Sequence, residues 1–202
     1  PSASMPAVAA GMVTLMEVLD CISACGVGPG HSFAVVGSGP VGQAFALFAR
    51  LLGAAPVTAF GRSAARAARF AEVSRCAYVA GTDFPASVRR ILEAGGYDIV
   101  LEAVGSPEAL ETALTLAGTR GQVKVYGVAP DSHPYTAATL QRPNVQQVGA
   151  REGRAQAQLV AMVQAGQVRL EDWVSHVLPL AESQRGFELV QVHKADKVVL
   201  VP

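Results

Sequence analysis

Short apolar runs alternate with stretches of helical apolar spacing along most of this chain. The runs are long enough for buried strands and too short for helices, and they predict strands at 32–36, 56–60, 77–79, 98–101, 122–126 and 145–148. Apolar residues at helical intervals predict helices at about 12–24, 41–52, 62–73, 84–94 and 107–116. Strands that alternate with helices are typical of a parallel sheet covered on both faces. We therefore expect an α/β fold with about six strands.

A glycine-rich turn follows the first predicted strand and opens a helix. It has the G-x-G-x-x-G spacing and consists of Gly37, Ser38, Gly39, Pro40, Val41 and Gly42. The first glycine would permit a tight turn, the second would let the backbone approach a pyrophosphate, and the third would let the helix pack closely on the sheet. The helix would offer unpaired N–H groups and the positive end of its dipole to the anion. Pro40 suits the first turn, where its missing N–H is not needed.

The glycine spacing alone is a weak signal, because turns often contain glycine. Between a strand and a helix, inside a βαβ unit of about 30 residues, it predicts a dinucleotide-binding site. The fold class is therefore a Rossmann doubly wound parallel sheet with helices on both faces. The alternative interpretation is a glycine-rich turn that binds no ligand.

The end of the second strand indicates which dinucleotide is bound. NAD-binding versions carry an acidic residue about 20 residues further on, which holds the ribose 2′-hydroxyl. Nineteen residues after the last motif glycine, this chain has Gly61, followed by Arg62 and Ser63, with Arg66 one helical turn further. A carboxylate would repel a 2′-phosphate, whereas an arginine can bind it in a fork. This predicts NADP(H), held by Arg62 with help from Ser63 or Arg66. The alternative is that Arg62 is a solvated residue at the start of the next helix.

Small residues follow several other predicted strands. In an open parallel sheet, ligands bind outside the carboxyl ends of the strands. Those ends include 103–105, 126–128 and 149–150, where small residues would suit a flat cofactor close to the backbone. Tyr126 has acid–base chemistry, but a packed aromatic ring is the favoured interpretation. The sequence predicts no catalytic residue.

Composition and charge exclude several classes of function. The formal net charge is +0, so there is no electrostatic footprint for nucleic acid or an anionic membrane. No run of 18 apolar residues is present, which argues against a membrane span. Only 16% of residues are charged, against about 25% in average domains. Either the alanine-rich composition explains this, or something outside the chain covers part of its surface.

Cysteine and histidine do not form a metal-binding pattern. The three cysteines do not make a disulfide framework, and their scarcity suits a cytoplasmic location. Cys21 and Cys25 lie four apart on a predicted helix without a nearby histidine, which favours buried apolar roles. The histidines are scattered and are expected to be solvated or hydrogen-bonded loop residues: His31, His133, His176 and His193. We expect no metal site.

Four stretches carry a resemblance to a known family, and together they cover almost the whole chain. They are residues 11–15 with 26–30, residues 36–42, residues 98–105, and residues 175–180 with 186–189 and 197–200. The chain resembles the cofactor-binding half of a medium-chain dehydrogenase/reductase, the superfamily of alcohol dehydrogenases and quinone oxidoreductases. Members with Gly-Arg after the second strand tend to use NADP, in agreement with the interpretation of Arg62.

The resemblance implies a function and a division of the chain. It implies hydride transfer between NADPH and a carbonyl, an alcohol or an activated alkene. The nicotinamide end would be held by Ala103, Val104, Gly105, Tyr126, Gly127 and Val128. Residues 12–150 would form the NADP-binding domain, and residues 151–202 a return segment that completes an N-terminal catalytic domain absent from this chain. The chain alone would then be inactive.

The resemblance also bears on metal and partners. Some members supply a zinc ligand just before the first helix, where this chain has Ala10, Val13 and Thr14, none of which binds zinc. The substrate would be a small molecule, and a homo-oligomer through the sheet edge at 145–148 is expected by analogy. The chain begins at Pro1 without an initiator methionine or the basic start of a signal peptide, which suggests a piece of a longer protein.

Two other functional classes remain open. A non-enzymatic NADPH-binding module or sensor would bind the cofactor without turning anything over. A methyltransferase also has a glycine-rich cofactor loop, but these enzymes usually have an acidic residue after the second strand. The pair Gly61-Arg62 argues against that class.

Overall fold

The structure, a computed structural model, describes residues 8–149, 155–192 and 194–202. The predictions for Ala150 and His193 fall outside these residues. By internal contacts the chain forms two compact units, one of Val18–Arg151 and one of Pro1–Glu17 with Glu152–Pro202. Helix α2 (Met12–Ala24) begins in the smaller unit and ends in the larger one, at the bounds that the apolar spacing predicts. The predicted domain boundary between residues 150 and 151 stays a prediction.

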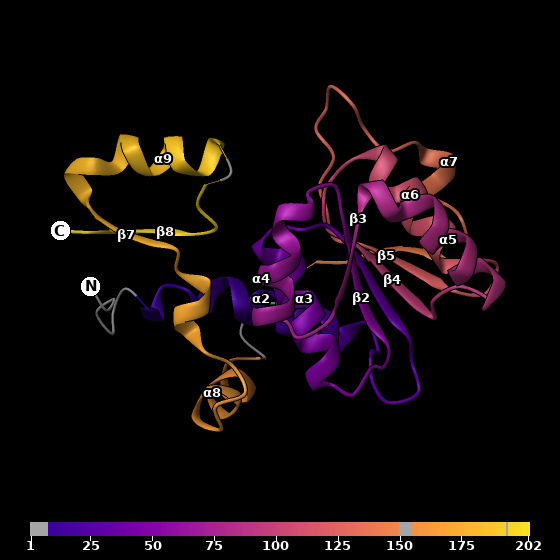
Figure 1. The fold of residues 1–202 in the computed structure, drawn as a ribbon, viewed down its shortest axis with the longest axis horizontal. Coiled ribbons are helices and arrows are strands. Elements are labelled where there is room, and N and C mark those ends of the chain that lie inside the picture. Colours follow the sequence, from indigo (N-terminus) through magenta and orange to yellow (C-terminus); the bar gives the residue numbers. More distant parts are fainter. Residues whose placement is uncertain (1–7, 150–154, 193) are drawn as a thin grey trace. The chain divides into compact units, whose positions relative to one another are not determined.

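The larger unit is built on a six-stranded parallel sheet in the order β3-β2-β1-β4-β5-β6 (Figure 1). Its strands are β1 (Phe33–Val36), β2 (Val57–Gly61), β3 (Ala77–Ala80), β4 (Ile99–Glu102), β5 (Gln122–Val125) and β6 (Val145–Gln147). The order reverses between β1 and β4, as in a doubly wound Rossmann sheet. The predicted fold class is confirmed, and each predicted strand end lies within one residue of the observed one.

Helices cover both faces of this sheet (Figure 1), with α3 and α4 on one side and α5 and α6 on the other. The helices are α3 (Pro40–Leu51), α4 (Ala67–Val73), α5 (Phe84–Glu93), α6 (Pro107–Ala117) and the short α7 (Ala137–Leu140). All four residues of β1 are buried, as expected for a central strand that packs on both faces. On the α6 side the core includes Phe60, whose ring meets Phe84 and Tyr97 edge-on at centroid distances of 5.7 and 6.1 Å.

The single helix predicted at 62–73 is wrong in its first part. Ser63 has extended backbone angles (φ −98°, ψ 112°), residues Ala64–Arg66 form a 3-10 turn, and α4 begins only at Ala67. The Ser63 carbonyl accepts hydrogen bonds from the Arg66 N–H at 3.2 Å and from the Tyr78 hydroxyl at 2.9 Å. Because Tyr78 lies on the neighbouring strand, a tertiary contact holds Ser63 outside the helix.

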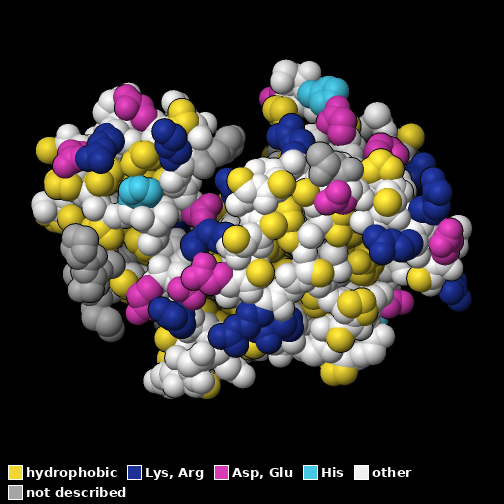
Figure 2. All heavy atoms as spheres, in the orientation of Figure 1, with side chains coloured by type: hydrophobic (Ala, Val, Ile, Leu, Met, Phe, Trp, Pro, Cys, Tyr) yellow, Lys and Arg dark blue, Asp and Glu magenta, His cyan; other side chains and the backbone are white. Residues whose placement is uncertain are grey.

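The smaller unit contains a βαβ element of its own. The elements of this unit are α8 (Gln156–Gln164), a 3-10 turn at Leu170–Trp173, β7 (His176–Pro179), a 3-10 turn at Leu180–Glu182, α9 (Ser183–Gln191) and β8 (Val198–Val201). Strands β7 and β8 pair in parallel, and α9 connects them. Several large apolar side chains of this unit are exposed, among them Phe187 at 65%, Leu180 at 61% and Val192 at 59%. Yellow atoms reach the surface over this unit in Figure 2.

Among the residues that the structure describes, none of the helices has the length and apolar character needed to cross a bilayer.

Candidate functional site

The carboxyl ends of the strands meet at one edge of the larger unit. In the β1–β4–β5 register, Val36 lies beside Glu102, which lies beside Val125. The Gly37 N–H donates to the Phe60 carbonyl at 2.9 Å, and the Ala103 N–H donates to the Val36 carbonyl at 2.9 Å. The segments predicted to bind cofactor therefore all follow strands that end at this edge.

The three motif glycines differ in whether the surrounding chain leaves room for a side chain. Gly37 has φ 142°, and a Cβ there would lie 3.1 Å from the Ala103 carbonyl oxygen. A Cβ on Gly42 would overlap the Gly37 carbonyl. Gly39 has φ −79° and ψ 178°, which any residue can adopt, and apart from its chain neighbours no atom of the described residues lies within 4 Å of a Cβ there. The chain itself thus requires glycine at 37 and 42, whereas at 39 the missing side chain leaves open space.

The open space at Gly39 lies at the start of helix α3. Pro40 is the first helical residue, and no side chain among the described residues caps the helix. The first backbone N–H groups of a helix have no partner within it, and together with the helix dipole they attract an anion. The first turn of α3 also contains no acidic residue. This end of the helix fits a phosphate group.

The end of β2 carries the residues predicted to recognise the adenosine ribose. Gly61 is buried, Arg62 and Ser63 are exposed, and Arg66 is half-buried. An Nη1 of Arg66 donates to the Ser38 carbonyl of the glycine loop at 2.6 Å. Arg66 therefore braces the loop from the 3-10 turn, and Arg62 is the more exposed of the two guanidinium groups.

The segments after β4 and β5 contact each other closely. A Cβ on Gly105, which has φ 90°, would overlap the Val128 backbone, and one on Gly127 would overlap the Gly105 N–H. Between these tight backbones, Val104 and Val128 expose 51% and 88% of their surface. Tyr126 packs edge-on against Phe45 with a centroid distance of 5.0 Å. This contact agrees with the interpretation of Tyr126 as a packed aromatic ring.

Glu102 holds the segments after β4 and β5 in place, although it is not among the site residues predicted from the sequence. The residue is fully buried at the end of β4. Its Oε1 accepts from the Val104 N–H at 2.7 Å and the Gly105 N–H at 2.8 Å, and its Oε2 accepts from the Tyr135 hydroxyl at 2.7 Å. Burial, together with the Glu102 carboxylate, raises the pKa of Tyr135, so the hydroxyl stays a donor. An acidic residue that directly follows an apolar run, three residues before Gly105, was the available signal.

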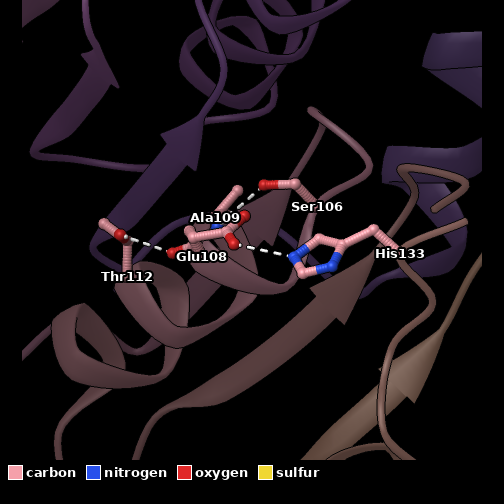
Figure 3. Close-up of polar contacts among 5 residues, drawn as sticks. All are labelled: Ser106, Glu108, Ala109, Thr112 and His133. Carbon is pink, nitrogen blue, oxygen red and sulfur yellow. Dashed lines mark hydrogen bonds and ion pairs between the residues drawn. The ribbon is translucent and has the colours of Figure 1, made fainter. Parts of the chain in front are cut away.

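A second contact joins the segment after β5, which contains both Tyr135 and His133, to helix α6. Figure 3 shows Glu108 facing the ring of His133, with Nε2 of His133 2.8 Å from Oε1 of Glu108. Ser106 caps the helix by accepting from the Ala109 N–H at 3.2 Å. The hydrogen bond with His133, followed by backbone and Ser106 hydrogen bonds, lowers the pKa of Glu108 to about 2. His133 is thus a hydrogen-bonded loop residue, as its sequence context predicted.

The contact between Glu108 and His133 should depend on pH. The pKa of Glu108 is about 2 in the folded chain against an ordinary 4.5, so ionised Glu108 stabilises the fold above about pH 4.5 and loses this effect as the pH falls to 2. Water screens the pair, because the side chains of His133 and Glu108 are 62% and 73% exposed, so the effect on unfolding is small. An NMR titration should find a Glu108 midpoint near pH 2, moving toward 4.5 in His133→Ala. An unchanged midpoint in the variant would contradict this cause.

The described residues offer no donor set for zinc. None of their His, Cys, Asp and Glu side chains form a group of three or more that could hold a metal ion. The thiols of Cys21, Cys25 and Cys76 are free of disulfides. Burial, partly opposed by Arg50, raises the pKa of Cys76 to about 11, so this thiol stays protonated at neutral pH. Cys76 lines a surface hollow of about 500 Å³ with Arg50 and Arg75, near the amino ends of β2 and β3 and away from the glycine loop.

A parallel sheet in this order, with a glycine loop at the reversal of strand order, defines a cofactor-binding domain of the Rossmann type. Residues 40–166 match the family model described as zinc-binding dehydrogenase. The chain belongs to this family, as the cofactor-binding domain of a medium-chain dehydrogenase/reductase. The resemblance predicted from the sequence motifs is confirmed.

Individual relatives agree with the family. The chain is 27% identical to an L-threonine 3-dehydrogenase of Bacillus licheniformis over 185 residues, which cover 88% of this chain and 53% of the relative. Among solved structures, the alcohol dehydrogenase TADH from Thermus sp. ATN1 matches with 30% identity and a TM-score of 0.78, over 100% of this chain and 59% of that one. The chain spans about half the length of the curated relatives it matches.

More distant structures share the fold. The L-idonate 5-dehydrogenase of Escherichia coli matches with a TM-score of 0.82 at 19% identity, over 100% of this chain and 59% of that one. A structure from Sinorhizobium meliloti, assigned as a zinc-binding dehydrogenase and bound to NADP, matches with a TM-score of 0.74 at 22% identity, over 93% of this chain and 58% of that one.

Proposed function

We propose that this chain is the nucleotide-binding part of an NADP(H)-dependent oxidoreductase that transfers hydride to or from a carbonyl, an alcohol or an activated alkene. The observation that carries the proposal is the open space at Gly39, because neither the backbone angles nor the packing of the described residues requires glycine there. A group from outside the chain gives that glycine a reason. The pyrophosphate of a dinucleotide is the group that fits the start of a helix after a parallel strand.

The phosphate contacts come from the chain's own backbone. The N–H groups at the start of α3 would donate to the pyrophosphate, and the missing side chain at Gly39 would let the phosphates approach the loop. The hydrogen bond from Arg66 to the Ser38 carbonyl keeps the loop in shape before the cofactor arrives. A preformed loop reduces the ordering that binding would require.

The choice of NADP(H) over NAD(H) rests on the end of β2. A glycine stands where NAD-binding domains carry a carboxylate, and the exposed Arg62 follows it directly. A guanidinium can bind a 2′-phosphate through two parallel hydrogen bonds. We propose Arg62 as the phosphate ligand, with Ser63 beside it. Because Arg66 already donates to the glycine loop, we assign it mainly to that loop.

The nicotinamide itself would supply the hydride chemistry when bound. On the chain's side, the exposed Val104 and Val128 would offer apolar contacts to a flat ring, next to the backbones of Ala103, Gly105, Tyr126 and Gly127. The buried Glu102 fixes the Val104–Gly105 segment by accepting hydrogen bonds from both of its backbone N–H groups. These residues bind and orient the ring, and none of them is proposed to donate or accept a proton.

The remainder of the proposal concerns the whole protein. We propose that the exposed apolar side chains around β7, β8 and α9 are covered by a catalytic domain that binds the small-molecule substrate. The catalytic zinc or proton-transfer groups would then lie outside the described residues. We also propose a homo-oligomer through the edge strand β6 and a cytoplasmic location, in keeping with three cysteines that form no disulfide.

Calorimetry with NADPH, NADH and S-adenosylmethionine tests the proposal directly. We expect NADPH to bind the chain more tightly than NADH and S-adenosylmethionine not to bind. Binding of S-adenosylmethionine alone would favour a methyltransferase, and absence of all binding would overturn the proposal. A full-length protein that binds NADPH but reduces no carbonyl and oxidises no alcohol would favour a sensor.

Replacing Gly39 by alanine should separate binding from folding. The backbone angles suit alanine and the space is open, so the melting temperature should stay equal or rise slightly. The added methyl group would meet the pyrophosphate, so NADPH and NADH should both bind at least about 10-fold more weakly, or about 1.4 kcal/mol. Gly42→Ala is the matched control and should destabilise the fold, because its Cβ overlaps the Gly37 carbonyl. Wild-type affinity in Gly39→Ala would contradict the proposed pyrophosphate site.

A further inference from the structure

Position 61, the last residue of β2, has no room for a side chain. A Cβ on Gly61 would overlap the hydroxyl of Tyr78 and would lie 2.6 Å from the Cβ and 2.9 Å from the Oγ of Ser38. Non-bonded heavy atoms do not approach so closely without strain, because packed carbon atoms prefer separations of about 3.5–4.0 Å. A side chain at 61 would therefore have to displace both neighbours.

Both neighbours are held in place. The Tyr78 hydroxyl donates to the Ser63 carbonyl at 2.9 Å, and the Tyr78 ring packs on the fully buried Phe70 with a centroid distance of 5.0 Å. Ser38 belongs to the glycine loop, and its carbonyl accepts from Arg66 at 2.6 Å. Rotating the Ser38 side chain would move Oγ but not Cβ, so only a shift of the loop backbone would open the position.

We infer that Ser38 and Tyr78 are specificity-determining residues, because together they exclude any side chain at position 61 and hence the carboxylate that would hold an unphosphorylated ribose. This inference rests on the proposed function, since it concerns which dinucleotide the same site takes. Arg62 would supply attraction to the 2′-phosphate, and the closed position 61 excludes the opposing carboxylate. Specificity commonly combines an attractive element with one that rejects the alternative.

The melting temperature of the chain without cofactor tests the closure independently of binding. Gly61→Ala adds only a Cβ and should lower the melting temperature by about 3–10 °C, the range expected from overpacking in a domain of this size. Gly81→Ala is the matched control, because apart from the adjacent residues the nearest atom to a Cβ there would be the Cα of Arg62, at an ordinary contact distance of 3.6 Å. The control should melt within about 2 °C of the wild type. Equal melting temperatures of the two variants would show that position 61 is not closed to a side chain.

A rescue identifies the two residues as the cause. In a chain that carries Ser38→Gly and Tyr78→Val, adding Gly61→Ala should cost no more than about 2 °C, because both close contacts are gone. Tyr78→Val alone should give partial rescue, and it serves where the double variant folds poorly. A full cost of Gly61→Ala in both backgrounds would show that other atoms close the position.

The affinities for the two cofactors test specificity. Gly61→Asp alone should weaken NADPH binding without strengthening NADH binding, because the added side chain distorts the glycine loop. Adding Ser38→Gly and Tyr78→Val should raise NADH affinity at least about 10-fold above the same double variant with Gly61. The inference would be overturned if Gly61→Asp alone raised the NADH affinity as much as it does together with Ser38→Gly and Tyr78→Val. If the wild type binds neither dinucleotide, the proposed function fails as well, whereas the melting experiment still decides whether position 61 is closed.

Discussion

Replacing Glu102 by alanine is expected to lower the free energy of unfolding of the larger unit by about 3–5 kcal/mol. Glu102 is fully buried and accepts hydrogen bonds from the Val104 N–H, the Gly105 N–H and the Tyr135 hydroxyl. Alanine would leave the two backbone N–H groups without their acceptor and the Tyr135 hydroxyl with only the Gly127 carbonyl at 3.1 Å. Each unsatisfied buried group costs about 1–3 kcal/mol. Urea denaturation followed by circular dichroism measures the difference.

Two milder variants show how the cost is divided. Glu102→Gln keeps an oxygen for the two backbone N–H groups, so we expect a loss of about 1–2 kcal/mol. Tyr135→Phe removes only the hydroxyl donor and should cost about 1 kcal/mol. Glu111→Ala on the exposed side of α6 is the control and should stay within about 0.5 kcal/mol of the wild type. A loss in Glu102→Ala no larger than in Glu111→Ala would show that the buried network does not stabilise the fold.

Replacing Arg62 by alanine is expected to weaken NADPH binding by roughly 1.5–3 kcal/mol, or about 10- to 150-fold, while changing NADH binding little. The reason is that only NADPH carries the 2′-phosphate that the exposed guanidinium would bind. Titration calorimetry of both cofactors, at one salt concentration, measures the two affinities. The difference between the losses reports the phosphate contact, because the rest of the cofactor is the same.

Two other arginines serve as comparisons. Arg89→Ala on the exposed part of α5 removes the same charge away from the glycine loop and should leave both affinities unchanged. Arg66→Ala should weaken both cofactors by similar factors, since Arg66 binds the Ser38 carbonyl of the loop that both would use. Equal losses of NADPH and NADH in Arg62→Ala would remove the assignment of Arg62 to the 2′-phosphate.

The sheet and its glycine loop were predictable because local patterns determine them. Short apolar runs such as 33–36 and 99–101 form strands buried on both faces, and a G-x-G-x-x-G turn between a strand and a helix has few other uses. The helix predicted from Arg62 onward was wrong at its start. The apolar spacing of a helix contains no information about Tyr78 on the next strand, whose hydroxyl donates a hydrogen bond to the Ser63 carbonyl.

The roles of individual residues at the site depended on contacts between distant segments. Glu102 directly follows the strand predicted at 98–101, and its importance came from Tyr135, which lies 33 residues further along the chain. The sequence assigned the 2′-phosphate to Arg62 with possible help from Arg66, and only the hydrogen bond from Arg66 to the glycine loop gives Arg66 a role of its own. In the same way, only the structure shows that the chain's own packing requires glycine at 37 and 42 and leaves open space at Gly39.

The sequence by itself determined the class of fold, the family and the edge of the sheet at which the candidate site lies, because periodicity and glycine spacing act through the local backbone. The tertiary structure decided which motif glycines the chain's own packing requires and why position 61 stays without a side chain. The physical reason is that exclusion and hydrogen bonding between segments depend on distances across the fold, which residues such as Ser38, Gly61 and Tyr78 share only once the strands have paired.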